Sequence, residues 1–149
     1  VHIEWRFSEE GTEGVPEVQS EWLTPPSWFE PDMAKREVRF QKYSIEMVGR
    51  MHKAGVPIGA GTDTPIGMAI PGYSLHNELA FLVRAGLTPL EALKSATIRP
   101  AEFLNLENKM GTIEVGKVAD LVLLSANPLE DIGNTRKIEL VISKGNLIN

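Results

Sequence analysis

Asp63 is the residue in this sequence best placed to do chemistry, because it follows residues 56–62, a short run of small and apolar residues typical of a buried strand. A carboxylate at the C-terminal end of a buried parallel strand faces the cleft in which α/β proteins bind ligands and metals. Asp63 is therefore a candidate metal ligand or base. Alternatively, Asp63 only begins the turn over 64–67, since Asp followed by Pro and Gly is common in turns. The local sequence leaves both interpretations open.

The segment before this strand is predicted to be a long loop followed by a helix. Residues 8–34 are rich in Gly, Pro and acidic residues, which is the composition of a loop. Trp22 and Trp28 in this loop either cover a pocket or pack the loop onto the protein surface. A helix is expected over 34–54, where apolar residues recur every three or four positions and form one inner face: Phe40, Tyr43, Met47, Met51 and Ala54.

Two further helices are predicted after the strand. The helix over 75–85 is expected to begin with Ser74 as its N-cap and to carry Glu78 in its first turn, where a negative charge favours the helix dipole. The helix over 89–99 begins with Thr88-Pro89-Leu90-Glu91, which matches a capping box with Pro at the first helical position. The predicted buried stripe of the first helix is Leu75, Leu79, Leu82 and Val83.

From Gly111 onward the apolar pattern changes from helical to strand-like. The strand-like stretches are 113–118, 121–124, 140–142 and 147–148. A turn is expected at 144–146, between the last two. The sequence therefore predicts an α/β protein in two parts, in which residues 1–110 hold the helices and the site, and residues 111–149 form a β-rich tail.

Four blocks follow one another in the sequence: AGVPIGAGTDTP at 54–65, SLHNELAFLVRAGLTPLEALKSAT at 74–97, RPAEFLNLENKMGTIEVGKVADLVLL at 99–124 and NPLEDI at 127–132. In this order and spacing they resemble the C-terminal part of the metal-dependent amidohydrolase superfamily, especially imidazolonepropionases and metal-dependent prolidases. The resemblance implies the last units of a TIM-type (β/α)8 barrel, followed by strands of a small composite β-sandwich. A whole barrel needs roughly 250 residues, so we expect this chain of 149 residues to be a piece of a larger enzyme.

The resemblance also assigns the chemistry. It implies that Asp63 is the last ligand of a divalent metal, usually zinc, and that Asp63 passes a proton from metal-activated water to the leaving amine. Thr64, next to Asp63, is a candidate substrate contact. His76 opens the following helix, so it either contacts the substrate or orients a ligand or water at the same cleft, or it is simply an N-terminal helix residue. The other metal ligands of the family cannot be matched to residues of this sequence, because His2 and His52 lack partners at ligand spacing.

Composition excludes several classes of partner. The net charge is −5 and no cluster of Lys and Arg is long enough to follow a phosphate backbone, so we expect no nucleic acid. The absence of cysteine excludes disulfides and thiolate metal sites and fits the cytoplasm. No apolar run approaches about 18 residues, so no membrane partner is expected.

Two functions of different kinds follow from these observations. In the first, the chain is part of a hydrolase that cleaves C–N bonds of amide, cyclic amide or dipeptide type in a small-molecule substrate, and activity needs the N-terminal half or another subunit. In the second, the chain is a non-catalytic module that self-associates as a homo-oligomer through open strand edges. A third possibility is a small-molecule binder that uses Trp22 and Trp28.

Overall fold

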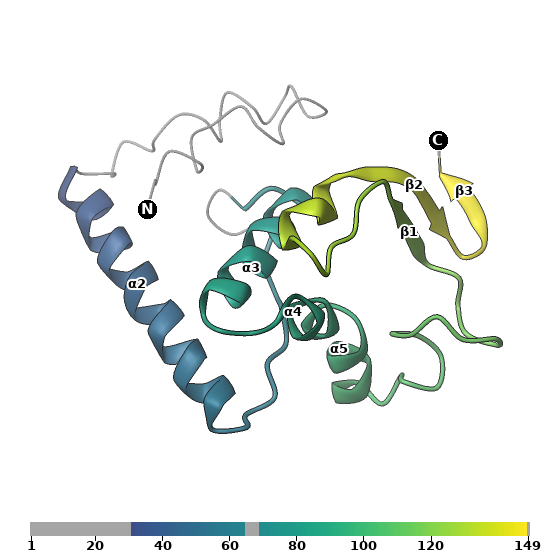
Figure 1. Ribbon diagram of the computed structural model, residues 1–149, viewed down its shortest axis with the longest axis horizontal. Coiled ribbons are helices and arrows are strands. Elements are labelled where there is room, and N and C mark those ends of the chain that lie inside the picture. Colours follow the sequence, from purple (N-terminus) through teal and green to yellow (C-terminus); the bar gives the residue numbers. More distant parts are fainter. Residues whose placement is uncertain (1–30, 65–68, 149) are drawn as a thin grey trace.

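The computed structural model describes residues 31–64 and 69–148. His2, Trp22, Trp28 and most of the predicted loop at 8–34 lie outside the described residues. Figure 1 shows α2 at one end of the molecule, the three-stranded sheet at the other, and the shorter helices between them. No helix in the described part is long and apolar enough to span a membrane. The elements are α2 Pro31–Lys53, α3 Tyr73–Arg84, α4 Pro89–Ser95, α5 Ile98–Phe103, β1 Leu121–Leu124, the 3-10 helix η2 Ile132–Arg136, β2 Ile138–Ser143 and β3 Asn146–Ile148.

The start of α4 confirms the predicted capping box. Thr88 Oγ1 accepts a hydrogen bond from the backbone of Glu91, and the Glu91 carboxylate accepts one from the backbone N–H of Thr88 at 2.8 Å. The helix is shorter than the predicted 89–99, because α4 ends at Ser95 and α5 begins at Ile98. Pro100 is accommodated in the first turn of α5, where a helix does not need its N–H.

The start of α3 differs from the prediction. The helix begins at Tyr73 after Gly72, which has φ 77° and provides no side-chain cap. Ser74 is buried and its Oγ accepts a hydrogen bond from the backbone N–H of Ile70 at 2.8 Å, so Ser74 closes the preceding turn and is not the N-cap. Because the helix starts at Tyr73, Glu78 lies beyond its first turn.

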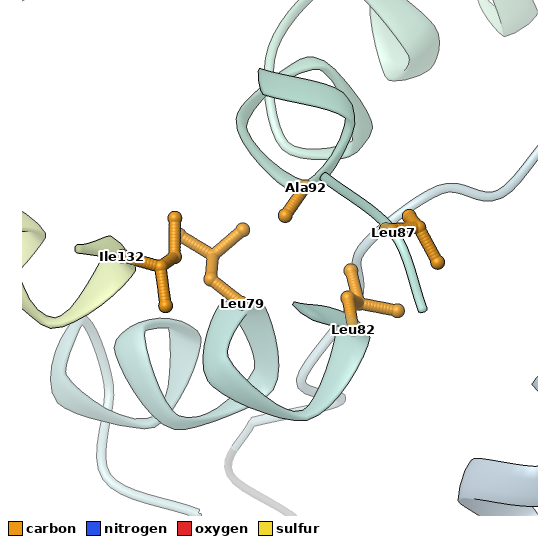
Figure 2. Close-up of a cluster of buried hydrophobic side chains, with 5 residues drawn as sticks. All are labelled: Leu79, Leu82, Leu87, Ala92 and Ile132. Carbon is orange, nitrogen blue, oxygen red and sulfur yellow. The ribbon is translucent and has the colours of Figure 1, made fainter. Parts of the chain in front are cut away.

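The core lies between α3, α4 and η2. The predicted stripe on α3 is confirmed, since Leu79 and Leu82 are buried and Leu75 and Val83 pack against the same cluster. Figure 2 shows Ile132 of η2 next to Leu79. This contact attaches the tail to the helical part of the molecule. The buried members of the cluster are Leu79, Leu82, Leu87, Ala92 and Ile132.

The predicted inner face of α2 is exposed in the structure. Phe40 is 65% exposed and Tyr43 63% exposed, and Met47 and Met51 are exposed as well. The helix instead approaches α3 at Gly49, where a Cβ would collide with the carbonyl oxygen of Ala85. The prediction failed because periodicity identifies an apolar face but not the element that covers it, and no element among the described residues covers this one.

The sheet is antiparallel with the order β1-β2-β3. The predicted turn before β3 is confirmed. Lys144 and Gly145 have φ of 49° and 80°, which suits a two-residue hairpin loop. Asp120 Oδ1 accepts a hydrogen bond from the Lys144 N–H at 2.7 Å and fixes this turn. Residues 113–118 contain no strand and turn at 115–116, where Gly116 has φ 92°, so the strand prediction for them is wrong.

Residues 56–62 form no ladder with a strand in the described part of the chain. The predicted strand is therefore not observed as a strand. The ladder of a barrel strand is made with neighbouring strands on both sides, and the described residues contain no such neighbours for it. Hydrogen bonds to the helices hold the segment instead, and the two nearest Asp63, made by Ala60 and Gly61, define the candidate site.

Candidate functional site

The segment 56–62 is held against two helices just before Asp63. The N–H of Ala60 donates to the carbonyl oxygen of Ser95 at 2.9 Å. The N–H of Gly61 donates to Oε1 of Glu78 at 2.7 Å. These bonds to α4 and α3 fix the backbone only two residues before the candidate ligand.

Asp63 is exposed and has a left-handed backbone with φ 55°. This conformation is uncommon for residues other than glycine, and strained residues of this kind gather at functional sites. Asn105, with φ 56°, and Lys144, with φ 49°, share it in ordinary turns, so the conformation alone fits the turn interpretation as well. Thr64 follows Asp63 and is half-buried. The exposed position of Asp63 leaves its carboxylate open to solvent.

Glu78 is a residue of this site that sequence reasoning did not identify. Its Oε2 is buried and has no hydrogen-bond partner among the described residues. Burial raises the pKa of the Glu78 carboxyl, and the hydrogen bond from the Gly61 N–H opposes this effect. A signal was present in the sequence, because Glu78 lies three positions after Leu75 and four before Leu82, on the apolar stripe where a charge is unexpected.

His76 contacts η2 instead of the segment 56–64. Its Nδ1 lies 3.0 Å from Oγ1 of Thr135, and its ring packs edge-on against Tyr73. Thr135 donates its single hydroxyl hydrogen to the carbonyl oxygen of Ile132 at 2.8 Å. Its oxygen must therefore accept the hydrogen of Nδ1, which leaves Nε2 of neutral His76 as a hydrogen-bond acceptor.

Arg136 completes the polar contacts around the start of α3. Its guanidinium donates to Oδ1 of Asn77 at 2.5 Å and lies over the ring of Tyr73. Burial lowers the pKa of His76, and the nearby charge of Arg136 lowers it further. The tail thus supplies a hydroxyl and a cation that hold His76 neutral and oriented.

An open cavity of about 590 Å³ lies beside the segment that carries Asp63. Residues 57–61 line it, together with Glu78 of α3 and residues of α5. Arg99 and Glu102 form an ion pair at its rim, with Nη1 and Oε2 2.7 Å apart. The α5 side of the cavity therefore carries both charged and apolar residues.

The described residues do not form a metal site by themselves. No three His, Cys, Asp or Glu side chains in residues 31–64 and 69–148 gather closely enough to hold an ion. Asp63 offers one carboxylate, whereas zinc sites need three or four protein ligands. Nδ1 of His76 bonds to Thr135, which leaves only Nε2 of that ring, and Nε2 of His52 lies 3.7 Å from Oε1 of Glu91.

Comparison with known proteins decides the family. A sequence model of the Amidohydrolase family matches residues 32–148. The chain belongs to the amidohydrolase family. An imidazolonepropionase of Thermoplasma acidophilum is 34% identical over 107 residues, which are 66% of this chain and 25% of that protein. An ochratoxinase of Aspergillus niger is 44% identical over 82 residues, which are 54% of this chain and 16% of that protein.

Solved structures agree with this assignment. A Xaa-Pro dipeptidase with bound methionine is similar with a TM-score of 0.64 and 32% identity, over 70% of this chain and 25% of the other. An amidohydrolase from Thermotoga maritima gives a TM-score of 0.58 at 32% identity, over 70% of this chain and 26% of that chain. The predicted resemblance to imidazolonepropionases and prolidases is confirmed, as is the α/β class. The chain spans about a quarter or less of the length of these relatives.

Proposed function

We propose that the amidohydrolase chain supplies Asp63 to a metal-dependent hydrolase that cleaves C–N bonds of amide, cyclic amide or dipeptide type in small molecules. The observation that carries the proposal is the position of Asp63. It is exposed, has φ 55°, and directly follows a segment fixed to α3 and α4. Membership of a family whose relatives include an imidazolonepropionase and a Xaa-Pro dipeptidase supports the reaction class.

In this proposal the chain provides a carboxylate to a site that other polypeptide completes. One oxygen of Asp63 would hold a divalent metal, by resemblance zinc, and the carboxylate would take the proton released by the attacking water and deliver it to the leaving nitrogen. The metal, when bound, would supply an activated water. We propose that the other ligands come from outside the described residues, because no group of three or more His, Cys, Asp or Glu side chains gathers within them.

Thr64 and His76 are proposed as substrate contacts on the two sides of the loop that follows Asp63. For His76 the proposal is supported by its Nε2, which is an acceptor in the neutral ring and suits a substrate N–H or O–H donor. A base that stays neutral near pH 7 accepts such a hydrogen bond, and the lowered pKa of His76 favours that state.

The exposed apolar surface supports an arrangement in which more polypeptide packs on this chain. Large apolar side chains of α2 remain uncovered, and the outer edges of β1 and β3 pair with no strand of the described part. We propose that residues 1–110 belong to a TIM-type barrel and that the β-rich tail at 111–149 completes a small β-sandwich with strands from the rest of the enzyme. A homo-oligomer of this chain is the competing arrangement.

The test is to measure the mass of the native assembly and its metal content, and to assay hydrolysis with and without a chelator. N-acyl amino acids, Xaa-Pro dipeptides and cyclic amides are the substrate panel. Assembly with further polypeptide, near one equivalent of divalent metal and chelator-sensitive hydrolysis are the expected results. An assembly of 149-residue chains alone that binds metal and hydrolyses the panel would contradict the need for other polypeptide.

A further inference from the structure

The carboxylate of Glu78 is connected to the turn that carries Asp63 through one short hydrogen bond. Its Oε1 accepts from the N–H of Gly61 at 2.7 Å, and Gly61 is two residues before Asp63. A hydrogen bond to an ionised acceptor is about twice as strong as one between neutral groups. Rotation of the Gly61 peptide would displace the left-handed turn that follows it.

This contact is costly for stability. Burial raises the pKa of Glu78, so ionising this carboxyl costs more free energy in the folded chain than in the unfolded chain. Its second oxygen, Oε2, is buried and accepts no hydrogen bond from the described residues. An apolar residue would suit the helix face better, because Leu75, Leu79 and Leu82 surround the position on α3. A residue kept for stability alone would not be a charged one here.

We propose that Glu78 is a positioning residue, which holds the Gly61 peptide and thereby sets the conformation of the Asp63 turn. Glu78 does not touch substrate in this account; it acts on the reaction through the backbone of residues 61–63. The inference rests on the proposed role of Asp63 for its catalytic meaning. The inference that Glu78 fixes the backbone of residues 61–63 does not depend on that role.

The test compares Glu78→Ala with Glu78→Gln in the 149-residue chain by amide NMR. Alanine removes the acceptor, and we expect exchange of the Gly61 amide to become roughly tenfold faster or more, with shifts of the Asp63 and Thr64 amide resonances. Glutamine keeps a neutral acceptor and should restore most of the protection, while thermal stability at pH 7 stays equal to or above that of the wild type. Glu102→Gln, on the same cavity but paired with Arg99, is the control and should leave Gly61 unchanged.

Several results would overturn the proposal. The first is an unchanged Gly61 amide in Glu78→Ala, with the amides of Leu79 and Leu82 still protected. The second is a shift confined to Gly61 that leaves Asp63 and Thr64 in place. If Glu78→Ala unfolds the chain, Glu78→Gln provides the test. A folded Glu78→Gln variant in which the Gly61 amide loses its protection would contradict the proposal, because glutamine still offers an acceptor. These readouts need no turnover, so they remain valid if Asp63 proves not to be catalytic.

In the active enzyme the same two variants distinguish a positioning role of Glu78 from a purely structural role. Glu78→Ala should lower kcat with little change in KM, and Glu78→Gln should recover most of the loss although it removes the charge. A purely structural role predicts that activity follows the folded fraction in both variants, and this result would contradict the positioning role.

Discussion

His76 and Thr135 are joined by a hydrogen bond between α3 and η2, with 3.0 Å between Nδ1 and Oγ1. Thr135 donates its hydroxyl hydrogen to the carbonyl oxygen of Ile132, so it can only accept in its hydrogen bond with His76. We therefore predict that neutral His76 carries its hydrogen on Nδ1. Nitrogen-15 shifts of the ring will show an acceptor-type Nε2, and Thr135→Val should release the ring into the mixed tautomers of free histidine. A protonated Nε2 in the wild type would contradict the assignment.

The buried carboxylate of Glu78 should make stability depend on pH. Because its pKa is raised in the folded state, the folded chain binds more protons than the unfolded chain above about pH 4.3, the ordinary glutamate pKa. Stability should therefore fall as the pH rises from this value through the folded pKa. Urea unfolding of the wild type and Glu78→Gln should give curves that diverge over this range, with the variant gaining relative stability at higher pH. Parallel curves would argue against a buried charge.

His76 should make stability depend on pH in the opposite direction. Its lowered pKa means that the unfolded chain binds more protons below about pH 6.5, the ordinary histidine pKa, so stability falls as the pH drops from there. Arg136 is the charged group that faces it from η2, and Arg136→Gln should therefore raise the pKa of His76. Titration of the His76 ring by NMR in both proteins checks the shift, and an unchanged or lower value in the variant would contradict it.

Gly49 allows α2 to approach α3. A Cβ at this position would collide with the carbonyl oxygen of Ala85, so Gly49→Ala should cost about 1–3 kcal/mol of unfolding free energy. Gly59→Ala is the control, because a Cβ there meets no atom within 4 Å. Equal stability of the two variants in urea would show that α2 is not packed at Gly49.

Ile132 attaches the tail to the helices. It is buried against Leu79, so Ile132→Ala should destabilise the chain by about 2–5 kcal/mol and expose the tail to limited proteolysis. Ile138→Ala, at a position that is 48% exposed, should have a much smaller effect. If Ile132→Ala leaves both stability and proteolysis unchanged, the tail is not held by this contact.

Local features of the fold were predictable because their causes lie within a few residues. The Thr88 capping box depends on side chains three positions apart, and the turn at Lys144 and Gly145 depends on residues that tolerate positive φ. The apolar stripe of α3 follows from its helical period. Asp63 was predicted as an acid after a small-residue segment, and the structure gives it an exposed position at the end of that segment.

Features that depend on distant partners were not predictable. The exposure of the apolar side of α2 could not be predicted, because sequence periodicity identifies an apolar face but not the element that covers it. Ser74 resembles an N-cap, but its hydroxyl oxygen accepts from Ile70 in the preceding turn. The bond between Glu78 and Gly61 joins residues that a loop separates, and only the folded chain brings them together.

The most direct test of the proposed function is to compare wild type, Asp63→Asn and Asp131→Asn in the fully assembled, metal-loaded enzyme. Asn at position 131 can still accept the N-cap hydrogen bond from Gly133, so that variant controls for the loss of an exposed aspartate charge. We predict that Asp63→Asn lowers the rate of hydrolysis of the substrate panel of N-acyl amino acids, Xaa-Pro dipeptides and cyclic amides at least roughly a hundredfold, the usual scale for a proton-transfer group. Asp131→Asn should retain wild-type rates. Wild-type hydrolysis and metal content in Asp63→Asn would contradict the assignment of Asp63.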